Sequence, residues 1–261
     1  MEKKMNVSQN VILAFSNQKG GTGKTTTAVN LAHALAVQSA GRVLLVDMDP
    51  QGNASQALGF KIQEQGLSVA DLLWDKNIPT EKAIQARAGF DVITANPALA
   101  RVERGMVTMT NSELRLRNRL HALRSSYGYI VIDSAPGAGP LLNSVLNAAD
   151  QLVIPVDSNY FALMGIQELL AEIVEIRATN PGLNVLGYLM TMVDRTLICG
   201  QTGDAVAQNF GSQVFATRIR RAVALREAPA FGQTVFEYAP ESGAADDYLR
   251  LSQELAGRLQ A

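Results

Sequence analysis

Short apolar runs alternate along the chain with longer segments that carry a helical pattern of apolar positions. The runs are rich in valine and isoleucine, and each has the length of a single strand. They are Val11–Phe15, Val43–Val46, Phe90–Thr94, Tyr129–Ile132, Leu152–Val156 and Val185–Val193. Because strands that are apolar throughout are buried on both faces, they are typical of a parallel sheet. The sequence therefore predicts one doubly wound α/β domain over residues 1–261, with a mostly parallel sheet flanked by helices on both faces.

The composition excludes some kinds of functional site. The chain of 261 residues is 47% hydrophobic and 18% charged, with a formal net charge of −1. Cys199 is its single cysteine, which excludes an internal disulfide and a thiolate metal cluster, and we expect a reducing cytoplasm. The first apolar run is far too short for a signal sequence, and no stretch approaches the length of a membrane span.

A glycine-rich loop follows the first predicted strand, and a helix is predicted after it, from about Lys24 to Gln38. Glycines let the backbone approach a polyphosphate, and a helix N-terminus favours its negative charge. Lys24 is expected to contact the β and γ phosphates of ATP, and the Thr25 hydroxyl to ligate Mg²⁺. The ordinary phosphate-binding pattern has a glycine where this chain has Gln18. The loop residues are Lys19, Gly20, Gly21, Thr22, Gly23, Lys24, Thr25 and Thr26.

Aspartates follow two other predicted strands. Asp47 and Asp49 come at the end of the second run, and Asp133 comes at the end of the fourth. Since functional groups gather at the carboxyl ends of parallel strands, we expect all three beside the loop. Carboxylates there can hold the water shell of a metal or orient an attacking water, and Asp133 matches a Walker B aspartate that holds Mg²⁺ through water. For the first pair, a turn in which an aspartate caps the next helix is the alternative.

Arginines gather in two places in the second half of the chain. Arg218, Arg220 and Arg221, with Arg226 beyond them, form a cationic cluster that can contact DNA phosphates without reading the sequence. A solvated helix face with salt bridges is the alternative. The second basic stretch, Arg115–Arg124, predicts a surface helix, and a docking site for an activating partner is the weaker possibility.

The loop resembles the deviant Walker A motif of the ParA/MinD superfamily of ATPases, and residues Asp47–Asn53 resemble that superfamily's D-x-D-P-Q-G-N stretch. Later segments narrow the resemblance, which spans about Val11–Leu259, to the ParA/Soj family without an N-terminal helix-turn-helix. This chain has Ala135 where the family more often has proline, and Ala224 where it has an arginine. The later segments are Pro155–Leu163, Leu189–Thr196, Arg226–Gly232 and Tyr238–Ser242.

The resemblance implies a slow ATPase that forms a sandwich dimer with ATP and Mg²⁺. Lys19 would then reach across the dimer to the partner's nucleotide, Asp49 would position the attacking water, and Asp47 would lie near Mg²⁺ and support hydrolysis. Among the arginines, Arg221 matches a DNA contact of the family, and Arg226 takes the place of a usual serine. The resemblance also implies adenine-side residues, which are Met192, Asp194 and Pro240.

The implied function is partitioning or positioning in the cytoplasm, on the nucleoid. An ATP-bound homodimer would bind DNA non-specifically, and a ParB-like or other cargo-adaptor protein would stimulate hydrolysis and release. The cargo, a chromosome, a plasmid or a protein assembly such as a carboxysome or chemotaxis cluster, stays open. A MinD-like membrane switch is the further alternative, but residues 246–261 carry too many acidic groups for a basic membrane-binding helix and predict a helix packed on the domain, so no membrane partner is expected.

Overall fold

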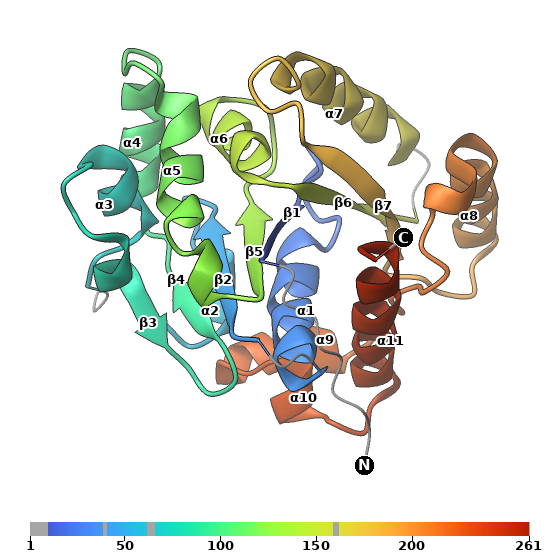
Figure 1. Ribbon diagram of the computed structural model, residues 1–261. Helices are drawn as coiled ribbons and strands as arrows, with labels where there is room; N and C mark the ends of the chain where they lie inside the picture. The colour runs from blue at the N-terminus through green and yellow to red at the C-terminus, as the bar shows by residue number, and fades with distance from the viewer. Residues whose placement is uncertain (1–9, 39–40, 62–65, 159–161, 261) are drawn as a thin grey trace.

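The computed structural model describes residues 10–38, 41–61, 66–158 and 162–260. Its strands form a seven-stranded sheet in the order β3-β4-β2-β5-β1-β6-β7 (Figure 1). Neighbouring strands are parallel except for β3 and β4, which pair antiparallel. The strands are β1 (Val11–Phe15), β2 (Val43–Met48), β3 (Ile84–Ala86), β4 (Asp91–Ile93), β5 (Tyr129–Ser134), β6 (Gln151–Asp157) and β7 (Asn184–Thr191).

Helices connect these strands and cover the sheet. The α-helices are α1 (Lys24–Gln38), α2 (Asn53–Ala57), α3 (Val69–Trp74), α4 (Ala98–Met106), α5 (Arg115–His121), α6 (Pro140–Ala148), α7 (Ala162–Ile176), α8 (Leu197–Phe210), α9 (Ala224–Glu227), α10 (Val235–Tyr238) and α11 (Gly243–Arg258). The short 3-10 helices are η1 (Thr80–Ala83), η2 (Ser112–Leu114), η3 (Arg124–Ser126), η4 (Gly211–Gln213) and η5 (Ala228–Phe231).

Each face of the sheet carries its own hydrophobic core. Successive strand residues point to opposite faces, so Ile12 and Ala14 of β1 pack into one core while Leu13 and Phe15 pack into the other. Helices α3 to α7 supply the first core, and α1 and α11 supply the second (Figure 1). This two-sided burial confirms the predicted doubly wound α/β fold and explains why the central strands are apolar throughout.

The sheet differs from the prediction at one edge. Strand β3 (Ile84–Ala86) matches none of the apolar runs, because it is an edge strand whose three residues are only partly buried or exposed. Strand β4 is also shorter than the predicted run Phe90–Thr94. By contrast, β1 and α1 have the predicted limits, whereas β2 and β5 each extend two residues beyond the predicted runs Val43–Val46 and Tyr129–Ile132.

The C-terminal helix α11 packs against α1, as predicted for residues 246–261 apart from Ala261, which lies outside the described residues. Tyr248, Leu251 and Leu255 are buried in the second core, and the Ser252 hydroxyl donates to the Gln38 side chain. The apolar face of this helix is therefore already covered. Within the described part of the chain, no helix is both long and apolar enough to cross a membrane.

Candidate functional site

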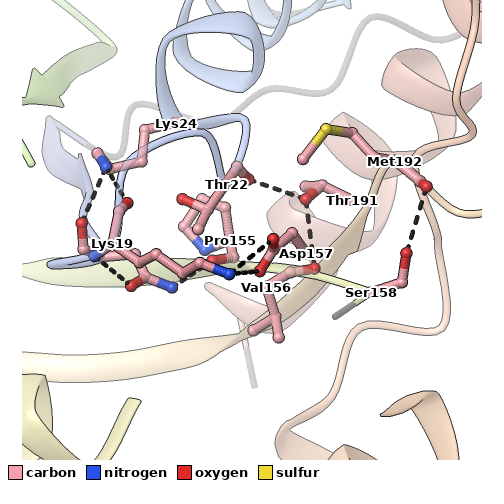
Figure 2. A network of polar contacts seen from close by, with 10 residues as sticks. Lys19, Thr22, Lys24, Pro155, Val156, Asp157, Ser158, Thr191 and Met192 are labelled. Carbon is pink, nitrogen blue, oxygen red and sulfur yellow. Dashed lines mark hydrogen bonds and ion pairs between the residues drawn. The ribbon is translucent and has the colours of Figure 1, made fainter. Parts of the chain in front are cut away.

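The glycine-rich loop lies between the end of β1 and the start of α1, as predicted. Gly21 and Gly23 have φ values of +76° and +81°, a conformation that side chains with a Cβ rarely adopt. The Thr191 hydroxyl donates to the Thr22 carbonyl at 2.8 Å and so ties the loop to β7 (Figure 2). The first N–H groups of α1 have no partner within the helix and carry partial positive charge. This end of α1 therefore favours an anion.

Lys24 is buried beneath the loop. Its ammonium donates to the carbonyls of Asn17 at 2.9 Å and Lys19 at 2.8 Å (Figure 2). Burial lowers the pKa of Lys24, and the nearby carboxylates of Asp133 and Asp49 oppose that shift. The neutral carbonyls leave the ammonium charge uncompensated at short range, so phosphate oxygens would be stronger partners.

Lys19 points away from Lys24 and pairs with the end of β6. Its ammonium lies 3.1 Å from the Asp157 carboxylate, and its side chain is 33% exposed (Figure 2). Asn17 fixes the loop here, because its side-chain amide donates to the Pro155 carbonyl and its oxygen accepts from the Lys19 N–H. The two loop lysines therefore have different surroundings, one buried and one on an accessible rim.

Asp49 lies on the cavity beside the loop, whereas Asp47 lies behind it. Asp49 is 4% exposed and accepts from the Gln51 N–H at 2.9 Å and the Asn53 amide at 3.0 Å. Asp47 is fully buried and accepts from the N–H and hydroxyl of Ser55 and from the Asp49 N–H. Burial raises the pKa of Asp47 to about 6, although the hydrogen bonds from Ser55 act against the shift. Asp47 therefore holds the backbone that presents Asp49.

Asp133 is the penultimate residue of β5 and lies beside Asp47 in the sheet register. It is fully buried, and neither carboxylate oxygen has a hydrogen bond of ordinary geometry with any described residue. Burial and the adjacent Asp47 raise its pKa well above the ordinary value, while the nearby Thr25 hydroxyl lowers it. The Lys24 ammonium lowers it as well, and a bound metal cation would act in the same direction, because a buried carboxylate is unfavourable unless cations compensate it.

These groups fit a magnesium ion that comes with a nucleotide. No group of three or more His, Cys, Asp or Glu side chains in the described residues could hold a metal by itself. Mg²⁺ commonly binds through one or two protein oxygens, substrate phosphates and water. The Thr25 hydroxyl and the unpartnered Asp133 carboxylate match that requirement.

A cavity of about 770 Å³ connects these parts. Ligand cavities commonly measure about 300–1,000 Å³, so a nucleotide fits. Its wall includes Gly20–Thr27, Asp49, the strand end Ser134–Pro136 and Met192. Met192 has φ +51°, unusual for a residue with a side chain. The structure thus brings most of the predicted nucleotide residues to one cavity.

The other predicted adenine-side residues lie outside the described lining of this cavity. Asp194 accepts from the N–H and hydroxyl of Thr196, and Pro240 is exposed. The cavity is also lined by residues that the sequence did not indicate, which are Glu103, Ile219, Ala222, Leu225 and Tyr248. They come from segments far apart in the sequence and carry no local motif; the sequence predicted packing on the domain for the helix of Tyr248, but no place in the cavity.

The arginine cluster also borders the cavity. Arg220, Arg221 and Arg226 line it, while Arg218 lies towards α8, near Gly203. Arg220 donates to both carboxylate oxygens of Asp247, so its charge is compensated. Arg221 and Arg226 are exposed at the rim.

In the second basic stretch, Arg115–Arg124, two arginines bind backbone carbonyls at the end of α3. Arg119 donates to the carbonyls of Leu72, Asp75 and Ile78, which follow or end α3. Arg115 donates to neighbouring carbonyls there. These bonds satisfy the unpaired carbonyls of a helix end, so these two arginines have a structural role.

Comparison with known proteins identifies relatives of this chain. The sequence matches the AAA domain family over residues 10–185. The chromosome-partitioning ATPase Soj of Thermus thermophilus is 42% identical over 95% of this chain and 96% of its own. The chromosome partitioning protein ParA of Myxococcus xanthus is 41% identical over 95% of this chain and 88% of its own.

Solved structures share the fold. Cobyrinic acid a,c-diamide synthase from Mycobacterium smegmatis with bound ADP and magnesium has a TM-score of 0.83 and 29% identity, covering 96% of each chain. An ATP complex of Cyanothece McdA has a TM-score of 0.82 at 21% identity, covering 95% of this chain and 96% of that one, and shows likeness of fold alone.

Proposed function

The chain belongs to the ParA/Soj family of ATPases. On that premise, we propose that it is a positioning ATPase whose ATP-bound dimer binds DNA and dissociates from it after ATP hydrolysis. The observation that carries the proposal is that Lys24 and Asp49 line one cavity, with the buried Asp133 near enough to Lys24 to act on its pKa. ATP and Mg²⁺ are its cofactors, in keeping with the ADP and magnesium bound in the M. smegmatis structure.

Nucleotide binding uses the loop, with adenine contacts on the Met192 side. Lys24 exchanges its carbonyl partners for β and γ phosphate oxygens, since an ion pair in a buried site is stronger than a hydrogen bond to a neutral group. Thr25 and Asp133 would hold the magnesium ion. The ion would supply positive charge that compensates the phosphates.

Hydrolysis depends on Asp49, which orients the attacking water. Gln51 and Asn53 fix both of its oxygens, and Asp47 fixes its backbone N–H. Asp47 is thus a positioning residue that supports the reaction through Asp49. Because positioning and electrostatics supply all the catalysis, turnover is slow until an adaptor protein stimulates it.

Dimer formation completes the site with Lys19. In the single chain this lysine is held by Asp157 at the accessible rim. Contact with the phosphates of a partner protomer requires that the ion pair break, and ATP supplies the charge that replaces Asp157. The dimer therefore depends on a triphosphate.

DNA binds non-specifically at the rim, where Arg221 and Arg226 are exposed. Two protomers double the number of cations, so dimerisation converts weak contacts into useful affinity. Arg218 is a further candidate contact, whereas Arg220 is engaged by Asp247. The protein acts on the nucleoid in the cytoplasm, and a ParB-like or other cargo-adaptor protein stimulates hydrolysis. The buried apolar face of α11 gives no support to a membrane-binding tail.

The test compares Asp49→Ala with the wild-type protein. The variant is expected to bind ATP, dimerise and stay on DNA with little phosphate release. Asp204→Asn, an exposed charge change on α8, is the matched control and should turn over normally. Wild-type phosphate release by Asp49→Ala would refute the assignment of this site.

A further inference from the structure

The exposed arginines and the nucleotide share one wall of the cavity. Residues 219–222, together with Leu225 and Arg226, line it along with the phosphate loop. The start of this wall is an extension of the sheet, because the Ile219 N–H donates to the Met190 carbonyl and the Arg221 N–H donates to the Val193 carbonyl, both at 2.9 Å. The exposed arginines therefore belong to the same segment as residues that line the nucleotide cavity.

The three arginines of this wall differ in what holds them. Arg220 makes a bidentate pair with the buried carboxylate of Asp247, at 2.7 and 2.8 Å. Arg221 lies 3.5 Å from Asp194 with its side chain 61% exposed, the geometry of a weak surface pair. Arg226 is exposed and makes no ion pair or hydrogen bond through its side chain with any described residue. Two cations of the wall are therefore available to an external anion.

Two acidic groups near these cations also have neutral hydrogen-bond donors of their own. The Glu227 carboxylate, next to Arg226 on α9, accepts from the Tyr238 hydroxyl at 2.9 Å. Asp194 is shared, because it also accepts from the N–H and hydroxyl of Thr196. Phosphate groups of a DNA backbone can compete for Arg221 and reach Arg226 directly.

We propose that DNA bound by Arg221 and Arg226 holds this wall over the nucleotide and slows nucleotide release. The inference rests on the proposed function, since it needs DNA at this rim. Phosphates that bridge the two arginines fix a wall segment whose inner side contacts the ligand. By thermodynamic reciprocity, nucleotide then strengthens DNA binding by the factor by which DNA strengthens nucleotide binding. The protein stays loaded while it stays on DNA.

The experiment measures release of a fluorescent, non-hydrolysable ATP analogue with Mg²⁺ after a chase with unlabelled analogue. It is run with and without a non-specific DNA duplex, at low salt and at a DNA concentration shown by anisotropy to saturate each protein. Variants are Arg221→Gln and Arg226→Gln. Arg177→Gln is the control, because it removes the same charge from an exposed site after α7.

Saturating DNA is expected to slow release from the wild type and from Arg177→Gln by at least about fivefold, the lower end of ordinary coupling between sites. Arg221→Gln and Arg226→Gln should lose most of that slowing although DNA is bound. Unchanged release on DNA-bound wild type would overturn the inference and leave the proposed function standing. Wild-type slowing in both variants would also overturn it, because the dimer alone would then trap the nucleotide. Failure of the wild type to bind DNA would refute both proposals.

Discussion

Asp157→Asn tests whether Lys19 is held back in the single chain. The Lys19 ammonium lies 3.1 and 3.4 Å from the two Asp157 carboxylate oxygens. The side chains are 33% and 12% exposed, so the pair is partly shielded from water. If Lys19 leaves Asp157 to reach a partner's phosphates, each protomer loses one ion pair when the dimer forms.

The size of the effect follows from that geometry. A partly exposed ion pair contributes about 0.5–1 kcal/mol. Two protomers together lose about 1–2 kcal/mol, and each 1.4 kcal/mol changes a dissociation constant about tenfold. Asp157→Asn should therefore tighten the ATP-dependent dimer by about 5- to 30-fold.

The assay is sedimentation velocity over a series of protein concentrations with Mg²⁺ and a non-hydrolysable ATP analogue. Asp246→Asn is the control, because its pair with Arg250 is exposed and lies on α11. The gain should disappear when Lys19→Ala is added to Asp157→Asn. A dimer of equal or lower affinity in Asp157→Asn would show that Asp157 is needed in the dimer and would refute the reasoning.

Three further substitutions test the site and its support. Asp133→Asn should weaken Mg²⁺-dependent nucleotide binding by about 10- to 100-fold in calorimetry without lowering thermal stability, since it neutralises an unpartnered buried carboxylate; an unchanged Mg²⁺ dependence would contradict this role. Ser55→Ala removes a hydroxyl that donates to Asp47 and accepts from the Ala95 N–H, and should cost about 1–3 kcal/mol in urea unfolding; unchanged stability would argue against that anchor. Burial raises the pKa of Glu237, but hydrogen bonds from Arg87 and Thr234 outweigh it and hold that pKa below 4.5. The resulting stabilisation is present above pH 4.5 and is lost as the pH falls through the lowered pKa. Glu237→Gln should therefore lower the melting temperature at pH 7 and differ less from wild type near about pH 3; a pH-independent difference would count against it.

Complete burial made most of the fold predictable. Central strands such as β1 and β5 are apolar on both faces, so their sequences mark them without knowledge of their neighbours. Strand β3 escaped prediction because an edge strand of three residues has no such pattern. The burial of such an edge strand depends on its neighbours in the assembled sheet and cannot be predicted from its own sequence.

The site was predictable where one motif supplies it. The loop lysines and Asp49 lie within short, recognisable segments, whereas Leu225 and Tyr248 reach the cavity through long-range packing. Pairwise contacts were equally invisible in the sequence. The pairing of Arg220 with Asp247, for example, joins residues that only the packing of α11 brings together. Part of the resemblance to the ParA/Soj family, residues 159–161, lies outside the described residues.

Retention of the wild-type protein on non-specific DNA in the absence of nucleotide, with ADP and with ATP, each with Mg²⁺, tests the central claim most directly. Strong retention is expected with ATP but not with ADP or without nucleotide. It should be lost at high salt, and it should be absent in Lys24→Ala, which lacks the buried phosphate contact. Equal retention in all three nucleotide states, or none with ATP, would contradict the claim that this ATPase is a nucleotide-controlled DNA switch.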